Sequence, residues 1–131
     1  MLYPMFAMVM LTMLVLVYMA VIRVRSVANK QVDAKYFRLM EGDGLPRHVA
    51  QAGRHVANLF ETPVLFYAAG ILTIVMNLSG TLTIALGWAY VGCRLVHAAI
   101  HLTYNHPLHR MLAFVLSLLC IMGLWLILII K

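Results

Sequence analysis

Long runs without charged residues dominate the chain. Residues 1–22, 62–93 and 111–130 contain no Asp, Glu, Lys or Arg. About 20 apolar residues in a helix, at about 1.5 Å each, cross a hydrocarbon core of roughly 30 Å. The polar cluster at 77–81 divides the middle run into two helices. The pattern therefore predicts an all-α fold, an integral membrane four-helix bundle in one domain over 1–131, with spans at about 2–22, 56–76, 82–103 and 111–130.

Gly and Pro residues indicate where the helices end. Gly42 and Gly44 interrupt the chain, and Pro is tolerated in a first helical turn, so the second helix should begin near Pro46. Pro63 lies inside that helix and removes one backbone hydrogen bond, which predicts a kink. The third helix should end at Asn105-His106-Pro107. In the first run the positive charge follows the apolar residues, so we expect a retained helix rather than a signal peptide.

Composition excludes most soluble classes of protein. Hydrophobic residues make up 64% of the 131 residues and charged residues 11%, against about a quarter charged in a typical globular domain. Ten Lys and Arg against four Asp and Glu give a net charge of +6, yet a membrane-flanking loop accounts for it, so no nucleic-acid partner is expected. Most charges lie between positions 23 and 61 (Arg23, Arg25, Lys30, Asp33, Lys35, Arg38, Glu41, Asp43, Arg47, Arg54 and Glu61).

The clustered charges also predict a topology. Loops rich in Lys and Arg remain on the cytoplasmic side, so the loop between the first two helices should be cytoplasmic. Both termini then lie on the non-cytoplasmic side, in the cytoplasmic membrane if the source is bacterial, and the turn containing Arg110 is cytoplasmic. The isolated Lys131 opposes this assignment weakly.

Cys93 and Cys120 lie in apolar segments without metal-ligand spacing and are expected to be small core residues.

Polar residues at membrane depth form stripes on two helices. Strongly polar groups are costly there, so each needs a partner, a wet cavity or an interface position. With about 100° of turn per residue, the two stripes could line one polar pocket. The second-helix stripe contains Arg47, Gln51, Arg54, Asn58 and Glu61, and the third-helix stripe contains Tyr90, Arg94, His97, His101, Tyr104 and Asn105.

Several of these residues also allow a simpler interpretation. Arg54 and Glu61 could extend to the interface and pair with a neighbouring helix. His97 and His101 are spaced i, i+4, but such a pair alone lacks enough further ligands for a metal or haem site, so no metal is predicted. Hydrogen-bonded pocket histidines are the more frequent case. Tyr90 and Tyr104 could be interfacial aromatics.

The polar groups suggest a class of ligand. Guanidinium groups offer paired donors to carboxylates, Glu61 offers a partner to an ammonium group, and Asn58 can bind an amide. That combination suits a small zwitterionic peptide with more negative than positive charge. Glutathione is one such molecule.

The motif Arg54-x-x-x-Asn58-x-x-Glu61-x-Pro63 on the second of four short helices resembles the signature of the MAPEG family, the membrane-associated proteins of eicosanoid and glutathione metabolism, which includes the microsomal glutathione transferases. Arg94-x-x-His97, with Arg110 in the following turn, is similar to the prostaglandin E synthase branch. The likeness covers essentially the whole chain. One position differs, because the better-known synthases have a tyrosine where this chain has His101, and the nearest tyrosine is Tyr104.

The resemblance implies a homotrimer with glutathione, as co-substrate, held between neighbouring subunits. Residue by residue, Arg54, Asn58 and Glu61 would hold the tripeptide, and Arg94 and His97 would complete the pocket. Arg110 would be the catalytic residue that stabilises the thiolate, because a nearby guanidinium lowers the pKa of a thiol. A hydrophobic small-molecule substrate would enter from the lipid bilayer.

Three functions follow as hypotheses. The first is a glutathione-dependent membrane transferase or peroxidase that acts on hydrophobic electrophiles or hydroperoxides. The second is a non-catalytic membrane protein of the same fold, whose polar pocket serves another ligand or subunit packing. The third is a small transporter or proton relay built on Glu61, His97 and His101, for which four spans are few.

Overall fold

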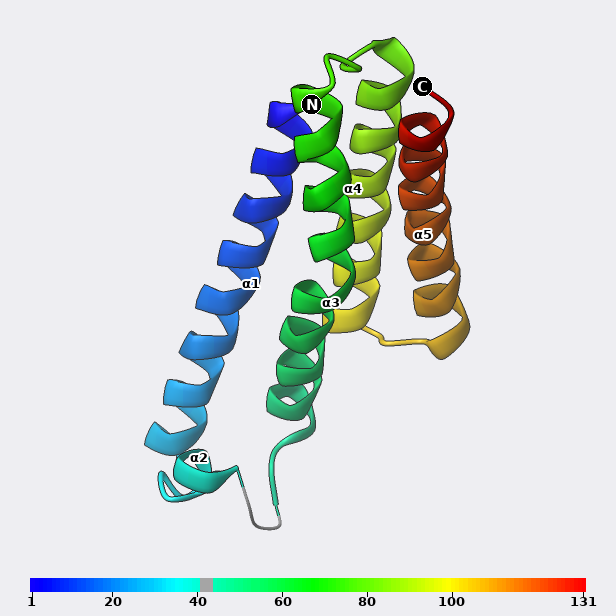
Figure 1. Cartoon of the computed structure of the whole chain (residues 1–131). Helices are drawn as coiled ribbons and strands as arrows, with labels where there is room; N and C mark the ends of the chain where they lie inside the picture. Colours follow the sequence, from blue (N-terminus) through cyan, green and yellow to red (C-terminus); the bar gives the residue numbers. More distant parts are fainter. Residues whose placement is uncertain (41–43) are drawn as a thin grey trace.

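Four long helices and one short helix make up the protein. In a computed structural model, which describes residues 1–40 and 44–131, they are α1 (Leu2–Ala28), α2 (Tyr36–Leu39), α3 (Arg47–Val75), α4 (Thr81–Leu102) and α5 (Pro107–Ile130). The four long helices lie side by side, and each is long and apolar enough to cross a membrane (Figure 1). The prediction of an all-α membrane protein with four long apolar helices is confirmed. Of the interruption expected at Gly42 and Gly44, Gly42 lies outside the described residues, and Gly44 has a positive φ of 99°.

The bundle packs around α3 and α4. Helix α3 packs against α1, α4 and α5, and α4 packs against α1 and α5, whereas the backbones of α1 and α5 do not approach each other closely within the described residues. Met8, Phe66, Tyr90 and Leu124 are fully buried where these helices meet. Most of the outward surface is apolar, as the membrane interpretation requires, because lipid tails rather than water surround it.

Two helix ends differ from the prediction. Helix α1 continues past Ile22 to Ala28, since Arg23 and Arg25 can extend their charged ends toward the interface while the backbone stays helical. Helix α5 begins at Pro107 rather than near residue 111, because Pro has no N–H to lose in a first turn. Arg110 therefore lies in the first turn of α5 and not in the preceding connection.

Helix α3 begins immediately after Pro46, as the sequence predicts. It continues through Pro63 to Val75, and its axis bends near mid-length (Figure 1). A proline inside a helix removes one backbone hydrogen bond and crowds the preceding turn, which accounts for a bend without a break.

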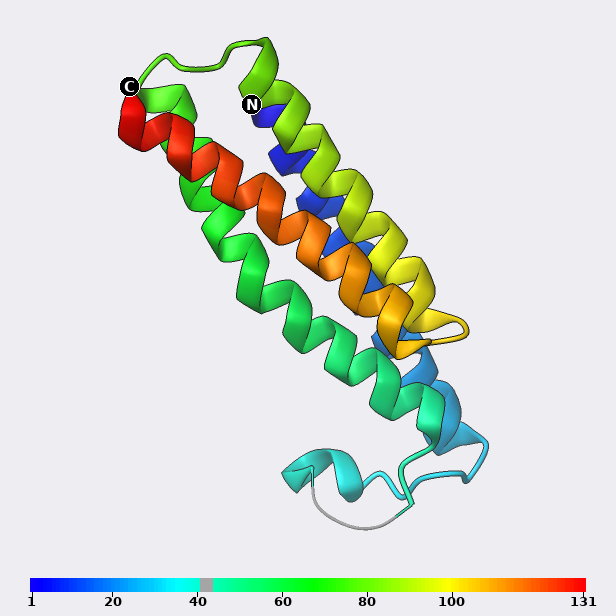
Figure 2. The ribbon, with the colours of Figure 1, turned by 90° about the vertical axis from the view of Figure 1, so that its right-hand side faces the viewer.

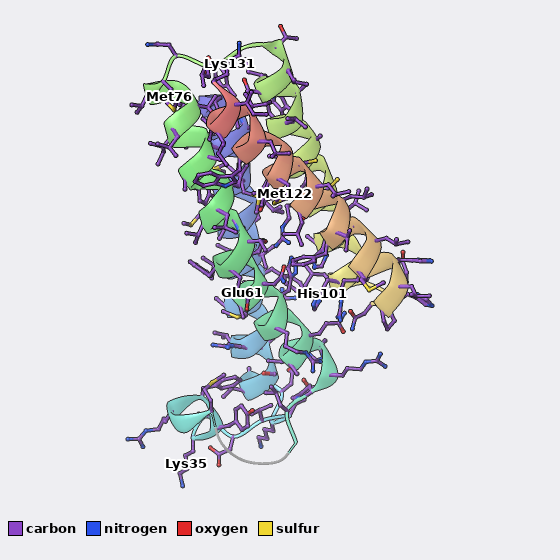
Figure 3. All side chains as sticks on the ribbon, turned by 45° about the vertical axis from the view of Figure 1, so that its right-hand side comes forward. Lys35, Glu61, Met76, His101, Met122 and Lys131 are labelled. Atoms are coloured by element: carbon purple, nitrogen blue, oxygen red, sulfur yellow. The ribbon has the colours of Figure 1, made fainter. Side chains whose placement is uncertain are left out.

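Both termini lie at the same end of the bundle. Figure 2 shows them beside the connection between α3 and α4, with α2 at the opposite end. Lys35 is at that opposite end, far from Met76 and Lys131 (Figure 3). The assignment of the basic end to the cytoplasm stays a prediction from the positive charges.

Gly87 allows α1 to approach α4 closely. A Cβ atom there would lie 3.2 Å from Pro4 Cβ and 3.0 Å from Met1 Sδ, whereas nothing lies within 4 Å of a Cβ at Gly92. Because overpacking forces neighbouring helices apart, we expect Gly87→Val to lower the free energy of unfolding by about 1–3 kcal/mol. Gly92→Val is the matched control and should be neutral. Denaturant titration in mixed micelles measures both, and equal effects would contradict the close approach.

Candidate functional site

A pocket of about 460 Å³ lies between α3, α4 and α5. Its volume falls in the range of small-molecule sites. Each of the three helices contributes polar side chains, and α5 adds an apolar wall. The two polar stripes of the sequence therefore meet in one pocket. Its lining consists of Arg54, Asn58, His97, His101, Pro107, Arg110, Met111 and Phe114.

Arg94 is fully buried beside this pocket and joins α4 to α3. Its Nη2 donates to Asn58 Oδ1 at 2.7 Å and to the Asn58 carbonyl at 3.3 Å. Its guanidinium carbon lies 5.9 Å from the ring centroid of Phe114 on α5. Within the described residues Nε and Nη1 have no hydrogen-bond partner. Arg94 therefore holds Asn58 in place rather than lining the pocket itself.

Arg110 is held at the pocket wall from two sides. Its Nη1 donates to Asn105 Oδ1 at 2.9 Å and lies 3.4 Å from His101 Nε2. Asn105 takes the left-handed conformation that closes α4, with φ of 53°, which Asn adopts more readily than most residues. The hydrogen bonds of the Arg110 side chain in the described structure all use Nη1, so Nη2 and Nε remain for a ligand.

A third buried histidine, which the sequence analysis did not single out, joins the predicted pair. The ring of His55 on α3 lies 5.6 Å from that of His97 and 4.8 Å from that of His101, centroid to centroid. Gln51 Nε2 donates to the His101 carbonyl and ties the same two helices together. His55 follows Arg54, about 100° further round the helix and off the polar stripe. A list of every polar residue at membrane depth, regardless of stripe, would have included it.

The structure separates the remaining candidates from the pocket. Glu61 is exposed on α3, does not line the pocket, and makes no ion pair with any described residue. It lies at a similar depth to His101 (Figure 3). Tyr90 is buried and stacks on Phe66 at 4.2 Å, so it belongs to the core. The exposed Tyr104 hydroxyl lies 3.0 Å from His109 Nδ1, outside the pocket.

The predicted site residues thus fall into three places. Arg54, Asn58, His97 and Arg110 line the pocket, Arg94 is buried beside it, and Glu61 faces outward. Cys93 and Cys120 are free thiols and are half-buried.

Comparison with known proteins gives one family match. The model of the MAPEG family matches residues 1–130, essentially the whole chain. No curated protein and no solved structure matches the chain.

Proposed function

Since this chain belongs to the MAPEG family, we propose that it is a glutathione-dependent transferase or peroxidase that acts on hydrophobic electrophiles or hydroperoxides. The observation that carries the proposal is the pocket, in which Arg54 and Arg110 come from different helices and face one cavity together with Asn58. Two guanidiniums match the two carboxylates of glutathione, because each can donate paired hydrogen bonds to a carboxylate. In this proposal Arg110 is the catalytic residue and stabilises the thiolate.

The donors of one subunit fit the anionic part of glutathione better than its ammonium group. Asn58 Oδ1 already accepts a hydrogen bond from Arg94, and among the described residues no carboxylate lines the pocket. Glu61 is the acid nearest along α3, yet it faces outward at membrane depth, where an unpaired charge is costly. A homotrimer accounts for this position, because Glu61 would then complete a site shared with the neighbouring subunit and would accept from the ammonium group.

The second substrate would reach the pocket from the bilayer. Met111, Phe114 and Pro107 form the apolar wall on α5, and the outer faces of the helices are apolar along most of their length. A hydrophobic electrophile that partitions into lipid would therefore meet the thiolate beside a nonpolar surface. This arrangement gives a physical reason for such an enzyme to lie in the membrane.

Glutathione binding tests the proposal directly. We expect detergent-purified protein to bind glutathione, and Arg54→Ala to weaken binding by about 10- to 100-fold, because a charge-assisted hydrogen bond contributes about 1.5–3 kcal/mol. Arg47→Ala is the matched control. Arg47 is exposed, lies two turns earlier on the same face of α3, and does not line the pocket. Isothermal titration calorimetry provides the measurement.

Two results would contradict the proposal. One is wild-type protein that neither binds glutathione nor conjugates it to any of a panel of electrophiles. The other is equal weakening by Arg54→Ala and Arg47→Ala, which would indicate a general loss of positive charge rather than a contact in the pocket.

The alternative is a non-catalytic membrane protein of this fold. One observation favours it: His101 stands where the better-known synthases have tyrosine, and Tyr104 does not replace that group because its hydroxyl is directed to His109. This alternative predicts a pocket that binds a ligand without activating a thiol. Substitution of Arg110, argued in the Discussion, separates the two functions.

A further inference from the structure

Four ring nitrogens in the buried histidine cluster have no hydrogen-bond partner among the described residues. They are both nitrogens of His55, Nε2 of His97 and Nδ1 of His101. The three side chains are only 0%, 3% and 5% exposed, respectively. An unsatisfied buried polar group costs about 1–3 kcal/mol, so four in one cluster need a physical explanation. Simple packing does not provide one, because an apolar side chain of similar size would avoid this cost.

We propose that His55, His97 and His101 bind a divalent transition-metal ion of the zinc class. One potential ligand atom from each residue lies within 4.8 Å of the others. Imidazole nitrogens bind zinc at about 2.0–2.1 Å, so tetrahedral ligands lie about 3.3–3.4 Å apart. The ligand atoms would therefore approach one another by at most about 1.5 Å, which small side-chain rotations can supply. Helical spacing pairs only His97 with His101, and the packing of α3 against α4 adds the third ligand.

His97 is already oriented as a ligand. Its Nδ1 lies 3.0 Å from the backbone carbonyl of Arg110, which can only accept, so Nδ1 carries the proton. The neutral ring then presents its unprotonated Nε2, which has no hydrogen-bond partner in the described part of the chain. Metal-binding histidines usually donate their other N–H to a carbonyl or a carboxylate in this way, and the hydrogen bond fixes both tautomer and orientation.

His101 makes a contact with Arg110 that would compete with metal binding, but this contact is weaker than the hydrogen bond of His97. Its Nε2 lies 3.4 Å from Arg110 Nη1, which is long for a hydrogen bond, and its Nδ1 has no hydrogen-bond partner within residues 1–40 and 44–131. If Nε2 binds the ion, the Arg110 contact is lost. If Nδ1 binds it, the proton moves to Nε2 and that contact also breaks. The metal would thus release Arg110 from His101 while leaving its hydrogen bond to Asn105.

The positive charges near the cluster favour a negatively charged fourth ligand. Arg94 and Arg110 lie close to the cluster and oppose a bare dication, since like charges repel strongly where water is excluded. An anionic fourth ligand offsets that repulsion. Because His97 and His101 also line the pocket, the fourth position would face it and accept hydroxide or a thiolate. Three histidines with one open position make up a known arrangement of catalytic zinc.

Cobalt binding tests the site without any glutathione, so its outcome is independent of the proposed function. The full chain, purified in detergent without a polyhistidine tag and treated with chelator, is titrated with Co²⁺. We expect one ion per subunit, with the intense visible absorption of four-coordinate cobalt, and displacement by Zn²⁺. His55→Gln should abolish this absorption. His55→Cys should retain it and add a thiolate-to-cobalt charge-transfer band.

The matched control is the surface pair His106 and His109, whose exposed rings lie 4.5 Å apart and could bind metal weakly. A variant with both changed to glutamine should keep the cobalt spectrum. Helical circular dichroism and the elution volume establish that each variant is folded. The proposal is overturned if folded wild type binds no cobalt, if His55→Gln leaves the spectrum unchanged, or if the surface double variant abolishes it.

Discussion

Arg94→Ala is expected to lower the free energy of unfolding by about 3–5 kcal/mol, the largest effect on stability among the pocket variants. The substitution leaves a cavity at a site with no exposed surface. It also removes the donor that holds the half-buried amide oxygen of Asn58. Both effects act where α3 and α4 meet, so the loss should lie in the upper part of the range for core truncations.

A methionine at the same position separates volume from charge. Burying Arg94 also costs free energy, since two of its nitrogens have no partner in the described structure. Arg94→Met fills most of the same space, so we expect it to cost less than about 1.5 kcal/mol. Because Asn58 still loses its donor, Arg94→Met should weaken glutathione binding even though the protein stays folded.

Unfolding in mixed micelles, followed by circular dichroism, measures both variants. Leu95→Ala is the control, because Leu95 is the next residue on α4 and is half exposed toward the lipid side. The interpretation is wrong if Arg94→Ala unfolds at the same denaturant concentration as Leu95→Ala. It is also wrong if Arg94→Met binds glutathione as tightly as the wild type.

The membrane fold was predictable from sequence because its cause is local. A run of about 20 uncharged apolar residues must span or be buried, and Ser79 and its polar neighbours mark the only break in the middle run. The ends of the helices were less predictable. Neither the extension of α1 to Ala28 nor the start of α5 at Pro107 changes the hydropathy pattern much. Helix continuation there depends on how arginine side chains reach the interface and on the tolerance for a first-turn proline.

The candidate site was only partly predictable from sequence. A polar stripe shows on which side of its helix a residue lies, but it does not show which residues of other helices that side meets. Helical periodicity correctly placed Arg54 and Asn58 on one side of α3 and His97 on the matching side of α4. It could not reveal that the packing of α3 against α4 turns His55 into the same cluster, since this depends on the relative rotation of two helices. Glu61 shares the stripe with Arg54 and follows the pocket residue Asn58 by three positions, yet its side chain is exposed and does not line the pocket.

Arg110→Ala is expected to lower kcat/KM for glutathione conjugation about 10- to 100-fold at neutral pH. In the proposed function the guanidinium stabilises the thiolate, so its removal raises the pKa of the bound thiol by about 1–2 units. Less thiolate is then present at pH 7, and activity recovers as the pH rises through the new pKa. The loss is therefore greatest at low pH and smallest at high pH.

The pH profile distinguishes stabilisation of the thiolate from simple binding. Arg110→Lys keeps a positive charge at the same position and should shift the profile much less than Arg110→Ala. Both variants retain the backbone carbonyl that lies 3.0 Å from His97 Nδ1, so the histidine keeps its orientation. Ultraviolet absorbance of the bound thiolate, recorded against pH, follows the same ionisation without an electrophile.

A loss of activity that is equal at every pH would indicate that Arg110 only binds the peptide, and unchanged activity would contradict its catalytic role. Wild-type protein that binds glutathione without forming thiolate would favour the non-catalytic alternative, because a pocket that lowers no thiol pKa has no nucleophile to offer at neutral pH.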